Sequence, residues 1–575
     1  MSAKRPDAAG GASASDSTQR SAQESTQRSA PESTQRSARE SDQRSAPDSA
    51  QGSTQGTVRR LIVFTLLFAL VSITATGVAG LLARLFETRP EFGTGPAGLA
   101  LSLAFTLVGG PLAVLLWWFP WRRLEGPDRS SIAWGLYLAA ICTVSLIVFT
   151  VSVLGALSDL VGGRWSPDAL ATGITWAAVW VVHRLMWAHP AKGPLRLTSV
   201  PTVLGAAYGL IVAAVGAIAA LTALFDAALR VGDVQVGEPW WRAALQALVW
   251  CAGGALVWGW HWVRDAVDRL RGGFADVMLV LVGVLAPVAV MLGGLGTALH
   301  VGLRAAFDRT EPWAAVSEPL GLALAAAAVG ALVWLAHRRA VAARGEVTRT
   351  AARLVRAGIG LIGAASGVGV IVNALLASLS PPLAGDDTRS LLLAGVASLA
   401  VGAPVWWAAW VPGRAPADPG SAGRRVYLVA VFGVSAVVAI IALLVVGYRI
   451  FEFVLGEAEG SLVERVRAPF GLLVATAIVA SYHFVVWRRD RRAAPAVTRA
   501  RTIDRVILVA AGDTATVAEA IAHATGASVT RWSRAGGGEA PPADAVVEAL
   551  TGIHARRVLV VVAPDGRAEV VPLQD

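Results

Sequence analysis

The sequence predicts an all-α polytopic membrane bundle of about twelve transmembrane helices, arranged as six repeated hairpins, with a small C-terminal soluble α/β domain. Three observations lead to this fold class. Hydrophobic residues make up 55% of the 575 residues and charged residues 16%, at a mean hydropathy of +0.57. Long apolar runs follow one another from Arg59 to Arg489, and a short pattern closes every second run. Beyond them the pattern changes to alternating strands.

The N-terminal segment 1–57 differs from the rest of the chain. It consists of Ser, Thr, Gln, Ala and Arg with almost no large apolar side chains, and an octapeptide recurs imperfectly from Ser17. Such a segment buries too little surface to offset its chain entropy. We expect a disordered cytosolic tail, with a docking or phosphorylation segment as the alternative.

The membrane region contains twelve apolar runs, each long enough to cross a hydrocarbon core of about 30 Å as a helix. Helices are expected because unpaired backbone groups are too costly in lipid and the alternation of a barrel strand is absent. The runs lie near 60–84, 99–120, 131–157, 170–187, 202–226, 243–263, 275–303, 319–336, 355–379, 391–411, 426–450 and 468–487. Grouped by fours, they give expected membrane units over 58–200, 201–345 and 346–492.

The charge of the loops predicts the orientation of these helices. Loops within the hairpins carry ten Lys or Arg against fifteen Asp or Glu, whereas loops between hairpins carry about eighteen against about seven. By the positive-inside rule the loops between hairpins are cytoplasmic. With an even number of spans, both termini are then cytoplasmic, in a multi-pass protein of the cell membrane. The arginines lie beside apolar runs, so we expect membrane lipids and no nucleic acid as partners.

A recurring Trp-x-x-His pattern marks the ends of the hairpins. Aligned on His337, the equivalent positions are separated by 62 to 78 residues, and a tryptophan stands three residues before five of the six. Tryptophan and histidine suit the interface because they combine an apolar body with a polar tip. The expected interfacial anchors are Trp118, Trp180, His183, Trp258, His261, Trp334, His337, Trp407, Trp410, His483 and Trp487. A metal site built from the four histidines and a small-ligand or lipid-headgroup site are the alternatives.

Other polar residues in the spans give no indication of chemistry. Cys142 and Cys251 lie inside apolar runs and are expected to pack as small apolar side chains. Asn373 is expected to hydrogen-bond between helices, and Pro111, Pro287 and Pro404 to kink them. We expect no catalytic residue, no cofactor and no metal, and therefore a protein that is not an enzyme.

The segment 502–575 has the pattern of a small soluble α/β domain. Arg505 to Ala511 reads as a buried strand and Thr514 to Thr525 as a helix. A second strand near Val529, a second helix from Ala543 and a hairpin around Pro564-Asp565-Gly566 follow. The turn Gly512-Asp513-Thr514 lies where nucleotide folds bind phosphate, but it lacks the glycines and the lysine of those motifs, so helix capping is the expected role. A cytosolic protein is the expected partner of this domain.

The membrane region resembles the bacterial family catalogued as domain of unknown function 5671. The resemblance rests on Arg424-Arg425-Val426-Tyr427-Leu428 at the start of one helix, on Gly402-Ala403-Pro404-Val405-Trp406-Trp407 in another, and on the Trp-x-x-His ends. It covers about 59–489, as three tandem four-helix units. The high content of Ala, Gly, Val and Arg is typical of a bacterial genome of high GC content. The family has no assigned activity, so the resemblance implies no catalytic residues.

Two functions fit these observations. The first is a noncatalytic membrane scaffold or sensor that acts through the C-terminal domain, because charged residues are scarce within the spans. The second is a transporter of a neutral or apolar solute, suggested by twelve spans in tandem repeats.

Overall fold

The computed structural model consists mainly of helices, with one small sheet near the C-terminus. The residues it describes are 32–87, 95–124, 129–229, 239–308, 311–379, 388–411, 422–456, 461–493, 503–534, 541–553, 555–563 and 567–573. Within these ranges, twelve helical stretches are long and apolar enough to cross a membrane. The predicted all-α membrane bundle is therefore confirmed, and so is the small C-terminal sheet.

The membrane helices form six hairpins, which we number in chain order. Hairpin 1 comprises α1 (Glu32–Phe86), α2 (Pro96–Ala104), η2 (Phe105–Gly109) and α3 (Gly110–Arg123), and hairpin 2 comprises α4 (Ile132–Val161) and α5 (Pro167–Trp187). Hairpin 3 comprises α6 (Val200–Leu229), α7 (Trp240–Gly259) and η4 (Trp260–Arg264), followed by η5 (Val267–Arg269). Hairpin 4 comprises α8 (Gly273–Val280), η6 (Leu281–Leu285), α9 (Ala286–Phe307), α10 (Trp313–Ser317) and α11 (Leu320–Ala342). Hairpin 5 comprises α12 (Glu346–Ala377) and α13 (Thr388–Trp410), and hairpin 6 comprises α14 (Ala422–Val454) and α15 (Leu462–Ala493).

Helix α1 begins well before its membrane span. It starts at Glu32, whereas the apolar span itself begins near Gln55. The sequence predicted a disordered tail over 1–57; the structure describes 32–57 as helical, and residues 1–31 lie outside the described ranges. Ala, Gln, Glu and Arg are good helix formers, and attachment to a long helix removes the cost of nucleation.

Two prolines follow π-helical turns inside the spans. Pro111 is the second residue of α3, which follows η2, and Pro287 is the second residue of α9, which follows η6. Proline has no N–H to donate and its ring displaces the carbonyl four residues earlier, so a wider π turn accommodates it. Pro404 lies inside α13. The sequence located these irregular points, although it predicted kinks rather than π turns.

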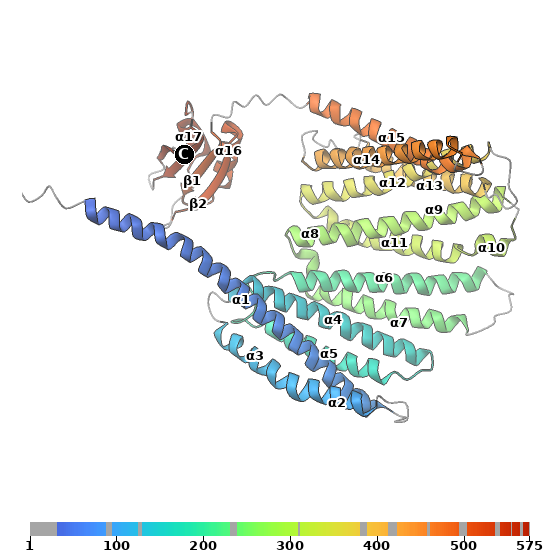
Figure 1. Ribbon diagram of the computed structural model, residues 1–575, viewed down its shortest axis with the longest axis horizontal. Helices are drawn as coiled ribbons and strands as arrows, with labels where there is room; N and C mark the ends of the chain where they lie inside the picture. The colour runs from blue at the N-terminus through green and yellow to red at the C-terminus, as the bar shows by residue number, and fades with distance from the viewer. Residues whose placement is uncertain are drawn as a thin grey trace, which may run out of the picture. The chain divides into compact units, whose positions relative to one another are not determined.

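The hairpins pack side by side in chain order in the compact unit that contains α1 to α13 (Figure 1). Glycines bring the helices of a hairpin into backbone contact: Gly209 of α6 lies against Trp258 of α7, and Gly367 of α12 lies against Leu399 of α13. Lipid is as apolar as leucine, so helices associate through such close contacts and not through hydrophobic burial. Gly209 and Gly367 thus let the two helices of a hairpin pack backbone to backbone.

The C-terminal domain is a four-stranded sheet with two helices. Its elements are β1 (Arg505–Ala510), α16 (Ala515–Thr525), β2 (Ser528–Ser533), α17 (Ala543–Ala549), β3 (Arg557–Val562) and β4 (Ala568–Leu573). The strand order is β2-β1-β3-β4, with β1 parallel to β2 and β3 and with β4 antiparallel to β3. Val506 pairs with Val529 on one side and Val558 on the other. The strands and helices predicted from the sequence are thus confirmed, and the turn 564–566 lies outside the described residues.

This domain has a core of its own, which generates the first prediction. Leu508, Ile521, Val546 and Val560 are fully buried in one apolar cluster. The fragment 502–575 should therefore be soluble and should melt cooperatively by circular dichroism. Leu508→Ala should lower its free energy of unfolding by about 2–5 kcal/mol, because it leaves a cavity in the core. Trp532→Ser is the control, since Trp532 is 58% exposed. A random-coil spectrum for the unmutated fragment would contradict the prediction.

Candidate functional site

The repeated helix ends place their histidines inside the protein. His183 of α5, His261 of η4, His337 of α11 and His483 of α15 are all buried, His337 with only 2% of its surface exposed. The tryptophans three residues earlier lie nearer the surface: Trp180, Trp258 and Trp334 are half-buried. Residues three apart on a helix differ by about 60° in direction, so one can face a neighbouring helix while the other faces outwards. We expected these histidines to contact lipid headgroups, whereas the structure buries all four inside the protein.

The remaining predicted anchors fall into three groups. Trp118 and Trp407 are exposed, Trp487 is half-buried and Trp410 is buried. Arginines stack on some of these rings: Arg122 lies 3.9 Å from the centroid of Trp118, and Arg491 lies 5.3 Å from that of Trp487. Such Arg–Trp pairs are suited to a boundary where one face is apolar and the other wet. Their depth in a lipid bilayer stays a prediction.

The same intrahelical hydrogen bond recurs at three of the histidines. The Nδ1 atoms of His183, His261 and His337 lie 2.8, 2.9 and 2.8 Å from the carbonyl oxygens of Val179, Val257 and Val333, four residues earlier in each helix. A carbonyl oxygen only accepts, so Nδ1 carries the proton in each ring. The neutral imidazole then presents Nε2 as an acceptor. The local sequence therefore fixes both the orientation and the tautomer of these rings.

The surroundings of Nε2 differ between the hairpins. In hairpin 2 the hydroxyl of Tyr137 lies 2.9 Å from Nε2 of His183 and donates to it. In hairpin 3, Nε2 of His261 lies 4.0 Å from the carboxylate of Asp265, which Arg184 of α5 also contacts at 2.5 Å. In hairpin 4, His337 instead packs against Trp262, at 4.9 Å between ring centroids, and Trp258, at 6.0 Å. The same helix position thus joins different neighbours in successive repeats.

Glycines provide the space for two of these rings. A Cβ atom on Gly205 of α6 would lie 2.6 Å from Nε2 of His261, and one on Gly283 of η6 would lie 3.1 Å from Cβ of His337. The first distance is far below a van der Waals contact, so His261 packs directly on the backbone of α6.

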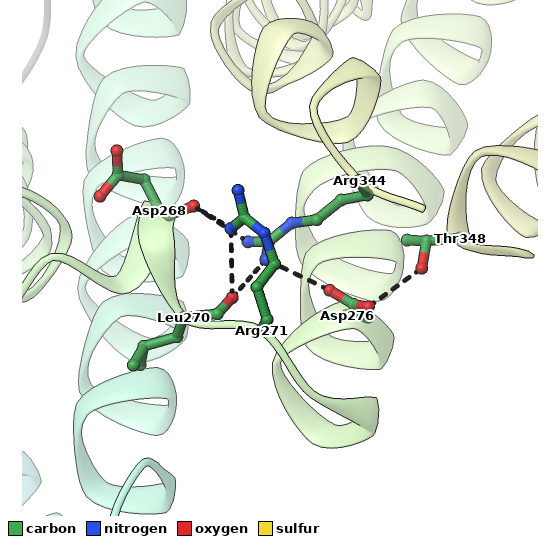
Figure 2. Close-up of polar contacts among 6 residues, drawn as sticks. All are labelled: Asp268, Leu270, Arg271, Asp276, Arg344 and Thr348. Atoms are coloured by element: carbon green, nitrogen blue, oxygen red, sulfur yellow. Dashed lines mark hydrogen bonds and ion pairs between the residues drawn. The ribbon is translucent and has the colours of Figure 1, made fainter. Parts of the chain in front are cut away.

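A buried arginine, Arg344, lies in the turn between α11 and α12 (Figure 2). Its side chain is 1% exposed, and Nη1 lies 3.3 Å from Oδ1 of Asp276 on α8. Its guanidinium also donates to the carbonyl oxygens of Leu270 and Asp268, the latter at 3.2 Å. Burial, and then the nearby charge of Arg271, lowers the pKa of Arg344.

Neighbouring residues complete this arrangement, which we call the Arg344 bracket: Asp268, Leu270, Arg271, Asp276, Arg344 and Thr348. Thr348 of α12 donates to Oδ2 of Asp276 at 3.0 Å, and Arg271 donates to the carbonyl of Asp268 at 2.9 Å (Figure 2). The bracket thus ties the loop after hairpin 3 and the start of hairpin 4 to the first turn of hairpin 5. No local sequence pattern predicts the bracket. Arg344 is one of several arginines in the loops, and no residue near it in the sequence indicates that its side chain is buried.

A small cavity lies beside the bracket. Its volume is about 30 Å³, and its lining includes Trp258, Trp262, Gly283, His337 and Arg344. A space of this size accommodates water, which needs about 10–15 Å³ on the same measure.

Metal and polar candidates within the spans are few. Among the described residues, His, Cys, Asp and Glu form no group of three or more that could hold a metal ion. Cys142 is buried, and Cys251 is half-buried. Oδ1 of Asn373 is buried with no hydrogen-bond partner among the described residues, so the expected bond between helices is not observed there. The polar contacts described above join helices to one another or to the turns between them.

These features define a multi-pass integral membrane protein built from helical hairpins, with a small α/β domain at its C-terminal end. The sequence model of the family described as Domain of unknown function (DUF5671) matches residues 60–184 and 350–480. The predicted resemblance to that family is confirmed for these segments, which fall on the first and third expected units. The middle unit, 201–345, lies outside both matches. No curated protein and no solved structure matches the chain.

The contact between Gly205 and His261 generates the second prediction. Gly205→Ala should lower the free energy of unfolding in mixed micelles by about 1–3 kcal/mol, because the new methyl group overlaps the imidazole. Gly259→Ala is the matched control, since it adds the same methyl group two residues before His261 with no atom within 4 Å of it. Equal stability of the two variants would show that the imidazole moves aside at little cost.

The third prediction concerns the Arg344 bracket. Arg344→Met keeps most of the side-chain volume but leaves Asp276 without its ion pair, so it should lower the free energy of unfolding by about 3 kcal/mol. Arg271→Met removes an exposed arginine from the facing loop before α8; its bonds stay within that loop, so this variant should melt close to the wild type. Thermal melts of the three proteins in detergent test this. Equal losses for both variants would show that the effect comes from positive charge near Asp268 and Asp276 and not from the ion pair of Arg344.

Proposed function

We propose that this protein is a noncatalytic membrane scaffold or sensor of the cell membrane, with both termini in the cytoplasm, which acts on a cytosolic protein through residues 502–575. The observation that carries the proposal is the C-terminal domain. It follows a membrane helix and a run of arginines, yet it has its own closed apolar core. A folded domain attached to a membrane bundle is suited to presenting a surface, and β2 forms an open edge of its sheet.

The packing of the membrane hairpins supports the same function. Backbone contacts close the space between paired helices at Gly209 and Gly216 in hairpin 3 and at Gly360 and Gly402 in hairpin 5. The bracket around Arg344 joins successive hairpins by ion pairs and hydrogen bonds. Such an arrangement favours a rigid support over an alternating-access machine, in which one bundle must rock against another.

A transporter of a neutral or apolar solute is the second candidate, and one observation favours it. A groove of about 510 Å³ lies along α6 and α11, lined by Val215, Thr222, Asp226 and Leu322 among others. It is large enough for a small apolar molecule, and it carries two polar groups. A test of the main proposal must therefore also measure solute movement.

The fourth prediction compares the full chain with a chain truncated after Ala493, by cross-linking and by membrane insertion. In cells, cross-linking should join the full chain to a cytosolic protein, and truncation should abolish this product while membrane insertion persists. Trp532→Ser, on edge strand β2, should weaken the cross-link, whereas Val571→Ser, on the opposite edge strand β4, should not.

Proteoliposomes test the alternative. Liposomes containing the full chain should take up small neutral solutes no faster than empty liposomes. Uptake that Asp226→Asn abolishes, together with cross-links that are unchanged by truncation, would replace the scaffold with the transporter.

A further inference from the structure

The small cavity beside the Arg344 bracket takes its shape from short side chains. Ala206 of α6 and Gly283 of η6 line it, together with larger apolar residues. A Cβ atom on Gly283 would lie 3.1 Å from Cβ of His337, so the backbone of η6 stands directly against the histidine. The lining also includes Trp258 of α7, His337 of α11 and Arg344 of the turn after α11. Residues of hairpins 3 and 4 and of the turn to hairpin 5 therefore border one space.

Three polar atoms of these residues have no partner in the described part of the chain. Nδ1 of His337 donates to the carbonyl oxygen of Val333, which leaves Nε2 as an acceptor with no hydrogen bond of its own. The Nη atoms of Arg344 contact Asp276 and two carbonyl oxygens, but its Nε is buried and unpaired. Nε1 of Trp258 is likewise buried and unpaired. One acceptor and two N–H donors thus belong to residues that line the same cavity.

Hairpin 2 shows what the equivalent acceptor binds when a hydroxyl is near. There the hydroxyl of Tyr137 lies 2.9 Å from Nε2 of His183 and donates to it. In hairpin 4 the glycine backbone at Gly283 provides no such hydroxyl. A water molecule offers the same O–H donor, and its oxygen accepts from N–H groups as well. Water can therefore satisfy all three unpaired atoms, whereas an O–H donor on a fixed side chain satisfies the histidine alone.

The size and polarity of the cavity both suit water. Its volume of about 30 Å³ exceeds the roughly 10–15 Å³ that one water molecule needs. Cavities with a purely apolar lining stay dry, whereas a buried water is stable where two to four polar groups surround it. Burying a donor or an acceptor without a partner costs free energy, so binding of water stabilises the fold.

We propose that this cavity binds an ordered water molecule, which donates to Nε2 of His337 and accepts from Nε1 of Trp258 and Nε of Arg344. The water bridges hairpin 3, hairpin 4 and the turn that leads to hairpin 5. It adds a hydrogen-bonded link to the direct contacts of the Arg344 bracket. The proposal does not depend on the scaffold or transporter functions.

X-ray radiolysis of the full chain in lipid nanodiscs, followed by mass spectrometry, tests the proposal. Radiolysis converts a bound water into a hydroxyl radical that oxidises the side chains beside it. Leu279 lines the cavity and is 7% exposed, whereas Leu292 of α9 is 9% exposed and lies outside the lining. Leu279 should therefore be oxidised faster than Leu292. A soluble radical scavenger should suppress oxidation of the exposed Trp532 but not that of Leu279.

Two variants assign this oxidation to the proposed site. His337→Phe keeps a ring but removes Nε2, and Ala206→Val adds two methyl groups to the lining. Both should lower the oxidation of Leu279 to the rate of Leu292. Ala220→Val is the matched control for Ala206→Val, because Ala220 is a buried residue of α6 outside the lining, and it should leave the oxidation of Leu279 unchanged.

Gel filtration identifies any variant that does not fold, and Trp258→Phe, which removes one of the two donors, then takes the place of His337→Phe. Equal oxidation of Leu279 and Leu292 in the wild type would show that the cavity is dry. Suppression by the scavenger would show that radicals reach Leu279 from bulk solvent. Oxidation that persists in a folded His337→Phe protein would show that Nε2 does not hold the water. Each of these three results would overturn the proposal.

Discussion

Direct backbone contact between helices is the constraint on which the membrane region depends. Apolar side chains gain little by leaving lipid for protein, so the hairpins need the dispersion contacts that only close approach provides. Gly209 against Trp258 and Gly402 against Ala364 show how this is met: a missing side chain on one helix admits the backbone of the next. Large apolar side chains such as Leu332 and Ile362 are left to cover the outer surface.

The close packing of the helices also determines where the buried polar groups find hydrogen-bond partners. A group inside the bundle must find a partner close at hand, and the histidines find one in their own helices, at the carbonyl oxygens of Val179, Val257 and Val333. This leaves Nε2 available for a second contact, such as the hydroxyl of Tyr137. Arg344 lies in a turn between spans, where backbone carbonyls are free to accept from it. Polar ties thus occur where helices end and chain segments meet.

The sequence predicted the elements better than the site, for a physical reason. Run length identifies a membrane span because lipid imposes one length, and a short run of β-branched residues before turn residues identifies a strand such as Val558 to Val562. Neither pattern shows which face of a helix meets a neighbour. The Trp-x-x-His spacing was therefore visible, but the inward direction of His337 was not. Likewise the burial of Arg344 depends on Asp276, 68 positions away in the chain, and no local pattern contains that pairing.

The histidines at corresponding helix ends have different neighbours in different hairpins. Tyr137 with His183 in hairpin 2 and Tyr427 with His483 in hairpin 6 bring the same two residue types into contact, at ring separations of 5.7 and 6.0 Å. The family model matches the segments that contain both tyrosines. In hairpin 4, Gly283 faces His337 instead, and Trp262 of hairpin 3 supplies the aromatic contact. In hairpins 2 and 6 the histidine contacts a tyrosine of its own hairpin. In hairpin 4 the histidine contacts a tryptophan of hairpin 3. The contact between Trp262 and His337 therefore joins hairpins 3 and 4. The Arg344 bracket joins both of these hairpins to hairpin 5. The expected middle unit, 201–345, is thus joined to hairpin 5 through side chains that a single four-helix unit does not need.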